Sequence, residues 1–148
     1  RSAPDPTGET SARLLVEWLF AQGTLIAGDP LIISSVSGTG RLAVELALHA
    51  RHRGLTVIAV TGADFSASLT SQHSSGMRLR DVADIVLDDQ VPDGDAALVI
   101  DGFPHRVGAW SGVSGVLLMW ALTVGIVERC VAAGVELTVF TSSASACA

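Results

Sequence analysis

Residues 31–43 read Leu-Ile-Ile-Ser-Ser-Val-Ser-Gly-Thr-Gly-Arg-Leu-Ala, and this stretch decides the fold. A short apolar run ends in hydroxyls and glycines, and a helix-forming segment follows at once. This order is typical of a buried parallel strand that leads through an anion-binding turn into a helix. Glycine lets a backbone approach a ligand closely, while Ser35, Ser37 and Thr39 add hydroxyl donors beside the free N–H groups of a helix N-terminus. The stretch therefore predicts a phosphate-binding loop.

The rest of the chain alternates segments of the same two kinds. We expect strands at residues 31–34, 55–60, 84–87 and 97–100, helices at 11–22, 40–53 and 111–133, and a helical turn at 77–82. Residues 62–76 are expected to form a loop and residues 135–140 an extended segment. For the first helix, the predicted core contacts are Leu14, Leu15, Trp18 and Leu25.

Strands that alternate with helices predict the α/β class, a parallel sheet flanked by helices. Ligands of such sheets bind outside the carboxyl ends of the strands, where the loop at 35–39 and the loop that carries His73 both fall. Three parallel strands are few for this architecture, so we expect an incomplete three-layer sandwich.

Composition limits the possible partners. The 148 residues fit one domain, which we divide into a disordered lead-in at 1–11 and a partial domain at 12–148. The net charge is −6 and no basic cluster occurs, so nucleic acid is not an expected partner. Cys130 and Cys147 show neither CxxC nor His/Cys spacing, which favours a reducing, cytoplasmic location and predicts no disulfide or zinc site.

The segment from Val107 to Val127 contains no charged residue and is long enough to cross a bilayer. Its first half is rich in glycine and serine, and only residues 116–127 are strongly apolar. That shorter run favours a buried or interface helix over a membrane span. We therefore expect a homodimer formed through the helix at 111–133.

Several motifs, in this order and spacing, resemble the SIS (sugar isomerase) domain, and within it an uncharacterised bacterial group of SIS-domain proteins. The resemblance covers residues 12–143 and rests on Gly28 to Gly38, Leu55 to Thr61, Ser71 to Leu79, Val82 to Asp88, Gly94 to Ala96 and Val107 to Ser111.

This resemblance implies a flavodoxin-like sheet that binds phosphorylated sugars without a cofactor, usually in a homodimer or larger oligomer. The family's phosphate loop reads S-x-S-G-x-S/T, and Ser35, Ser37 and Gly38 match it, whereas Gly40 stands where the last hydroxyl is expected. The family also has earlier strands, the first ending in a Gly-x-Gly-x-Ser turn, for which this chain has no counterpart. We therefore expect one wall of the sugar site to be missing.

The candidate site residues follow from the loop and from the resemblance. Ser35, Ser37, Gly38 and Thr39 are predicted to bind phosphate, and Ser111 is a further ligand contact that the resemblance favours. An alternative reading makes the serines helix caps. His73 and Glu45 are the candidates for moving protons between sugar carbons.

Two other groups of polar residues are expected to have no ligand-binding role. Glu45, His49 and His52 share one helical face, but cations near a helix end need no metal, and we predict none there. The acidic segment that contains Asp88, Asp89, Asp93 and Asp95 is expected to be a solvated turn.

The sequence is compatible with four functions. The leading hypothesis is a sugar-phosphate-binding domain, which an aldose–ketose isomerase would use with His73 and Glu45 as acid and base. The alternatives are a non-catalytic sugar-phosphate sensor, an ether-cleaving lyase acting on a sugar-acid phosphate, and a truncated, inactive fragment.

Overall fold

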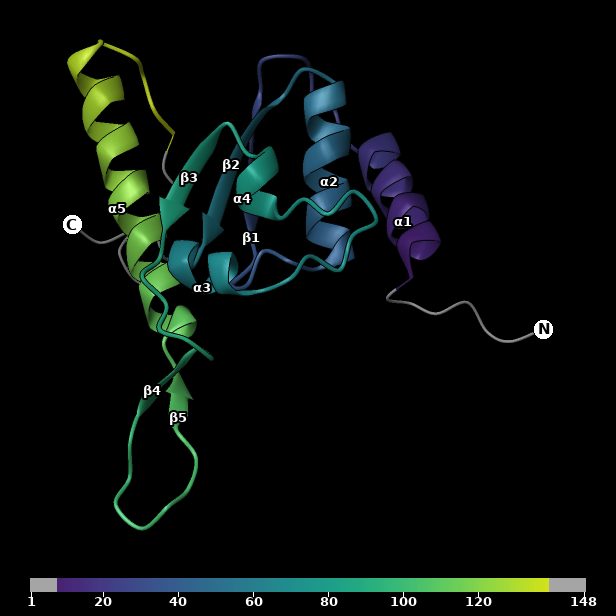
Figure 1. Cartoon of the computed structure of the whole chain (residues 1–148). Helices are drawn as coiled ribbons and strands as arrows, with labels where there is room; N and C mark the ends of the chain where they lie inside the picture. Colours follow the sequence, from purple (N-terminus) through teal and green to yellow (C-terminus); the bar gives the residue numbers. More distant parts are fainter. Residues whose placement is uncertain (1–7, 139–148) are drawn as a thin grey trace. The chain divides into compact units, whose positions relative to one another are not determined.

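The computed structural model describes residues 8–138 and divides into two compact units between Gly115 and Val116. Figure 1 shows the elements, which in chain order are α1 (Glu9–Gln22), β1 (Pro30–Ser34), α2 (Arg41–His52), β2 (Thr56–Thr61), α3 (Ala63–Ser68), α4 (Leu79–Val82), β3 (Ile85–Asp88), β4 (Ala96–Leu98), β5 (Val107–Ala109) and α5 (Ser111–Ala132).

The first three strands form a parallel sheet in the order β1-β2-β3. Flanking helices make this an α/β fold, as the sequence predicts. The register aligns Ile32, Ile58 and Ile85 in one row across the sheet. Ile32 and Ile85 are exposed, so this face of the sheet carries an apolar row that solvent reaches.

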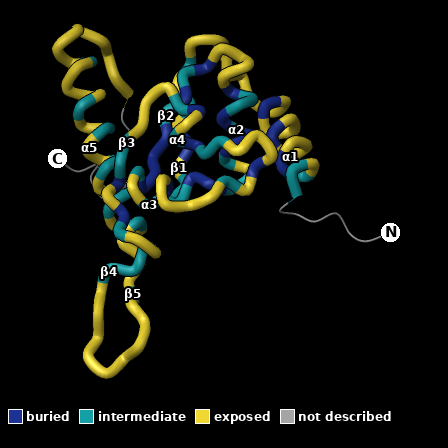
Figure 2. Tube along the Cα trace, viewed as in Figure 1, coloured by how far each residue is buried: buried dark blue, intermediate teal, exposed yellow. Residues whose placement is uncertain are grey.

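The hydrophobic core lies on the other face of the sheet, beneath α2 (Figure 2). Helix α2 begins after Gly40 and ends before Gly54, whose φ of +77° suits the residue that follows a helix. Its apolar side is fully buried against the strands, through Val44, Ala47 and Ala50. This packing fixes the loop between β1 and α2, because both of its ends belong to the core.

Helix α1 packs against α2 through a different face from the predicted one. The predicted contacts Leu14, Leu15, Trp18 and Leu25 are all exposed, and the prediction is wrong. The buried residues are Ala12, Val16 and Phe20, spaced four apart, and the Phe20 ring lies 4.7 Å from the imidazole of His49. Because α1 is apolar on two faces, composition alone does not select the covered one.

The start of α1 also differs from the prediction. The helix begins at Glu9, so residues 9–11 of the expected disordered lead-in are helical. The Glu9 carboxylate accepts hydrogen bonds from the backbone N–H and the hydroxyl of Ser74, which hold this end of the helix in place. Residues 1–7 and Cys147 lie outside the described residues.

The predicted loop at 62–76 contains a short helix, α3, so this part of the prediction is wrong. Six residues make a weak helix on their own. Here the Arg78 guanidinium donates to the carbonyls of Ser66 and Ala67, and the Arg80 guanidinium donates to the carbonyl of Ala63. These contacts from beyond the loop stabilise a helix that local sequence does not reveal.

The segment after β3 contains a separate two-stranded antiparallel sheet, β4-β5. The predicted strand at 97–100 is therefore present at 96–98, paired with β5. Residues 135–138, the described part of the expected extended segment, have no regular structure. Helix α5 matches its prediction within one residue, is long and apolar enough to span a membrane, and has no buried residue.

Candidate functional site

Hydrogen bonds from two other segments hold the loop between β1 and α2, in which Gly38 and Thr39 are buried. The Val36 carbonyl accepts hydrogen bonds from the Thr61 hydroxyl and the Gly62 N–H, both at 3.1 Å. The Gly38 carbonyl accepts from the Leu79 N–H at 2.7 Å. Residues that follow β2 and precede α4 thus fix the loop from below.

Gly38 has a structural reason to be glycine. Its φ of +62° lies in the left-handed region, and a Cβ atom would stand 3.1 Å from the Thr61 hydroxyl, 3.2 Å from the Ser66 hydroxyl and 3.3 Å from the Leu79 Cβ. Gly40 differs, because its φ is −67° and nothing lies within 4 Å of a Cβ there. The loop therefore needs glycine at 38 and tolerates a side chain at 40.

Two of the three hydroxyls predicted to bind phosphate, those of Ser37 and Thr39, lie together just before the start of α2. The hydroxyl oxygens of Ser37 and Thr39 are 3.1 Å apart, and Ser35 is held by its N–H, which donates to the Val60 carbonyl. No side chain caps α2 at Gly40. The first turn of a helix has backbone N–H groups without intrahelical partners, and its dipole favours an anion there. The Ser37 and Thr39 hydroxyls therefore lie next to the N-terminus of the 12-residue helix α2, where Gly40 provides no side-chain cap.

His73 and Glu45, the two predicted proton-transfer residues, lie in direct contact. The imidazole Nε2 is 3.0 Å from Glu45 Oε2, and both residues are buried. The Ser75 N–H points at Nδ1 at 3.2 Å, so Nδ1 accepts and Nε2–H donates to the carboxylate. The loop that carries His73 also adjoins the phosphate loop, because the Gln72 N–H donates to the Thr39 carbonyl.

Two residues of α1 complete this cluster and were missed by sequence reasoning. Arg13 Nε donates to Glu45 Oε1 at 3.1 Å, and Glu9 Oε1 lies 3.8 Å from His73 Nε2. Burial alone would raise the pKa of Glu45, but hydrogen bonds from His73 and Arg13 hold it below its usual value. Hydrogen bonds from Ser74 likewise lower the pKa of Glu9.

The structure does not assemble the set Glu45, His49 and His52. Glu45 is directed to His73 and Arg13, and the His49 ring packs on Phe20.

Ser111 is engaged elsewhere. Its N–H and its hydroxyl both donate to the Asp95 carboxylate, at 2.8 and 2.7 Å. This pair joins the start of α5 to the turn before β4, and Asp95 adopts a φ of +61° there. This is not the N-capping role considered for this serine, because its hydroxyl donates to Asp95 instead of accepting from the first N–H groups of α5.

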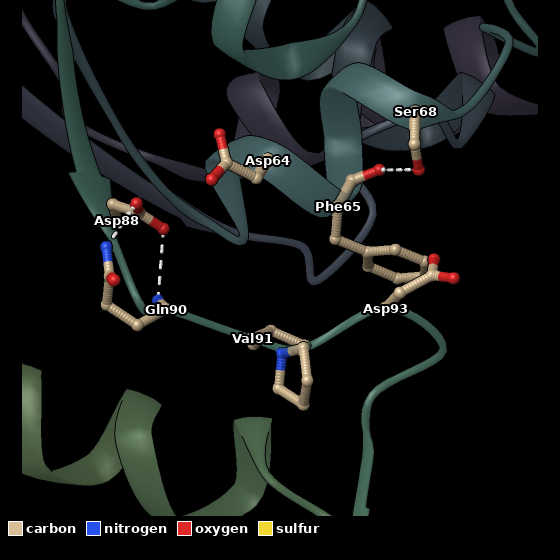
Figure 3. A pocket seen from close by; sticks show the side chains of 8 residues that line it. Asp64, Phe65, Ser68, Asp88, Gln90, Val91 and Asp93 are labelled. Atoms are coloured by element: carbon tan, nitrogen blue, oxygen red, sulfur yellow. Dashed lines mark hydrogen bonds between the residues drawn. The ribbon is translucent and has the colours of Figure 1, made fainter.

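A separate cavity of about 310 Å³ opens beside α3 at the carboxyl ends of β2 and β3 (Figure 3). Acidic side chains dominate its polar lining, from Asp64, Asp88 and Asp93. Their charge disfavours a phosphate, so the cavity is not a second anion site. Asp88 has a structural role as well, because it accepts a hydrogen bond from the Ala63 N–H at the start of α3.

The neighbouring Asp89 corrects the prediction of a wholly solvated acidic turn. It is 5% exposed, and its Oδ1 has no hydrogen-bond partner among the described residues. Burial, followed by repulsion from Asp88, raises the pKa of its carboxyl group.

Comparison with known proteins agrees with this architecture. The model of the SIS domain matches residues 11–62, from α1 to the end of β2. Residues 11–62 of the chain belong to the SIS-domain family. The matched part contains the loop between β1 and α2 and Glu45, whereas His73 and Ser111 lie beyond it.

Curated relatives extend the similarity. A UPF0309 protein of Shouchella clausii is 37% identical over 116 residues, 78% of this chain and 47% of the relative. One of Streptomyces coelicolor is 43% identical over 112 residues, 76% of this chain and 45% of the relative. One of Halalkalibacterium halodurans is 40% identical over 115 residues, 78% of this chain and 48% of the relative. The chain thus spans about half the length of the curated relatives it matches. Family membership supports binding of a carbohydrate derivative in general.

Proposed function

We propose that this SIS domain binds a phosphorylated sugar, with the phosphate held by residues 35–40. The observation that carries the proposal is the coincidence of the Ser37 and Thr39 hydroxyls with the uncapped N-terminus of α2. An anion there accepts charge-assisted hydrogen bonds from the hydroxyls and from backbone N–H groups, and it also gains from the helix dipole.

The binding test is calorimetric titration of the protein with glucose 6-phosphate, inorganic phosphate and glucose. We expect glucose 6-phosphate to bind more tightly than glucose, and Ser37→Ala to weaken its binding about tenfold, which is the loss of one hydrogen bond to a charged group. Ser68→Ala is the matched control, because that hydroxyl lines the acidic cavity and donates to the Phe65 carbonyl. Binding that survives Ser37→Ala but is lost in Ser68→Ala would place the sugar in the acidic cavity beside α3, and would contradict binding at the loop between β1 and α2.

Gly40→Ser provides the opposite change. It supplies the hydroxyl that the family pattern has at this position, and the open space at Gly40 accommodates the side chain. We expect it to strengthen binding of glucose 6-phosphate several-fold while leaving the affinity for glucose unchanged. Unchanged affinity for both sugars would argue against a phosphate at this loop.

Isomerisation between an aldose and a ketose phosphate is the more specific form of the hypothesis. It needs a base and an acid near the sugar, and the loop that carries His73 adjoins the phosphate loop through the Gln72–Thr39 bond. His73 and Glu45 are hydrogen-bonded to each other. We therefore propose that the main role of this pair is to position the loop 71–76, and that proton transfer is an additional role. Conversion of glucose 6-phosphate to fructose 6-phosphate, lost in Glu45→Gln, tests the catalytic hypothesis separately from binding.

We also propose that α5 mediates a homodimer. Among the described residues of α5 none is buried, and its 22 residues extend over about 33 Å at 1.5 Å per residue. Its charged residues, Glu128 and Arg129, lie near its C-terminal end, so most of its length offers a second copy an uncharged surface. Val116, Met119, Trp120 and Thr123 line a hollow on it.

Sedimentation of the full chain tests the dimer. We expect a dimer for the parent protein and a monomer for Trp120→Glu, because a buried charge at an apolar interface is strongly unfavourable. A monomeric parent that partitions into phosphatidylcholine vesicles would instead identify α5 as a membrane segment, and would overturn the dimer.

A further inference from the structure

Glu9, Glu45 and His73 form a cluster at which three separate segments meet. Glu9 stands at the start of α1, Glu45 in the middle of α2 and His73 in the loop before α4. One ligand atom from each side chain lies within 4.8 Å of the other two. Two carboxylates and an imidazole are ordinary ligands for zinc in proteins.

We propose that Glu9, Glu45 and His73 bind a divalent transition-metal ion, with Zn²⁺ as the fitting ion. The spacing of their atoms supports this. Zinc binds nitrogen and oxygen at 2.0–2.2 Å in a tetrahedron, which places neighbouring ligand atoms about 3.4 Å apart. The His73 Nε2 atom lies 3.0 Å from Glu45 Oε2 and 3.8 Å from Glu9 Oε1, so small side-chain adjustments admit the ion.

Each ligand also has an outer hydrogen-bonding partner of the kind that orients metal ligands. Ser75 Oγ stands 2.8 Å from His73 Nδ1, where it can accept the Nδ1–H of a metal-bound imidazole. Arg13 donates to the Glu45 oxygen that does not face the histidine, and Ser74 donates to both Glu9 oxygens. Binding requires the imidazole proton to change from Nε2 to Nδ1, by exchange with water and with no net loss of a proton from the ring. The Ser75 N–H, which points at Nδ1 at 3.2 Å, must turn away at the same time.

Charge and access agree with this assignment. Two carboxylates together carry the charge that balances a divalent ion. The Glu45 and His73 side chains are 11% and 4% exposed, whereas that of Glu9 is 27% exposed. The partly open side at Glu9 gives the ion a route of entry and leaves room for water as the fourth ligand.

The ion would connect α1, α2 and the loop 71–76, which adjoins the phosphate loop through the Gln72–Thr39 bond. Its role is therefore structural. An ion held by Glu45 and His73 leaves neither group free to transfer a proton, so this site is an alternative to the catalytic role of the pair, while phosphate binding does not depend on it.

The direct test is a calorimetric titration with ZnCl₂. It uses the whole 148-residue chain after treatment with a chelator and dialysis. We expect one ion per chain. His73→Gln should weaken binding at least about 100-fold, and Ser75→Ala, which removes the outer partner, about 10-fold. His52→Gln is the matched control, because His52 is exposed on α2 and outside the cluster; it should bind as the parent does.

His73→Gln removes a buried side chain, so a second variant protects the test against misfolding. Glu9→Gln changes only the more exposed ligand and should weaken zinc binding about 10-fold or more with an unchanged circular dichroism spectrum. Cobalt titration of the parent should produce visible d–d absorption that both variants lose. Absence of binding at one equivalent, or equal affinity in parent and Glu9→Gln, would overturn the proposal. Ser37→Ala should not change zinc affinity, which separates this site from the sugar-phosphate site.

Discussion

Residues 12–91 and residues 92–138 differ sharply in what they bury. Every buried residue that the structure describes lies in the first region, and between residues 92 and 138 none is buried (Figure 2). The comparison between α2 and α5 is the clearest. Helix α2 carries charged residues yet buries Val44, Ala47 and Ala50 completely, whereas α5 contains the strongly apolar run 116–127 and has no buried residue.

This difference teaches that the arrangement of apolar residues, rather than their number, identifies the helix that builds the core. Helix α2 has one apolar face, which the sheet covers. A helix that is apolar on all sides has no polar face to leave in water, and it needs a partner of its own. The predictions below test whether the first region folds without stabilisation from the second.

The largest expected effect comes from a matched pair of leucines. Leu79 in α4 is fully buried, whereas Leu117 in α5 is 69% exposed. Leu79→Ala should lower the free energy of unfolding by about 3 kcal/mol, since it leaves a cavity in the core. Leu117→Ala should change it by less than about 0.5 kcal/mol. Urea denaturation measures both, and equal losses would show that α5 contributes to the same cooperative core.

A pair of glycines gives the next effect. Gly38→Ala forces a side chain into a left-handed conformation and against the Thr61 and Ser66 hydroxyls, so we expect a loss of about 2 kcal/mol. Gly125→Ala in α5 meets nothing within 4 Å and raises helix propensity, so it should cause no loss. Thermal unfolding followed by circular dichroism compares the two. A tolerated Gly38→Ala would contradict the tight seating of the phosphate loop.

Local patterns were sufficient for most of the first region. The apolar run before Ser34 and the glycine after Arg53 predicted β1 and α2 within one or two residues, because burial and capping are encoded in neighbouring positions. The covered face of α1 was mispredicted, since Leu14 and Trp18 are as apolar as the residues that are buried. Only the position of α2 decides between those faces.

In the candidate site, too, some residues could be selected from the sequence and others could not. His73 and Glu45 were selected by residue type and family pattern, and the structure brings them together, although their role in catalysis stays a prediction. Their contact spans 28 positions and no periodicity encodes it. Glu9 and Arg13 gave no signal at all, because they reach the cluster only when α1 packs on α2.

Asp89 stands at the boundary of the two regions and offers the smallest, most specific test. Its buried Oδ1 has no hydrogen-bond partner in the described part of the chain, and its pKa is raised by burial and by the Asp88 charge. As pH rises, the unfolded chain ionises this group first, near its ordinary value of 3.8, while the folded protein ionises it later and at a higher free energy. The destabilisation therefore grows as pH rises between these two pKa values and persists at neutral pH.

Asp89→Asn removes the buried charge. We expect it to stabilise the fold by about 1 kcal/mol at pH 7, with the gain shrinking as pH falls toward the ordinary pKa of the carboxyl group. The exposed Asp93→Asn, four residues along the same turn, is the control and should change stability by less than about 0.5 kcal/mol at either pH. Urea titrations at pH 7 and pH 4 measure both variants. No gain for Asp89→Asn at pH 7 would mean that the carboxylate is solvated, and a gain that is the same at the two pH values would mean that it does not come from the buried charge.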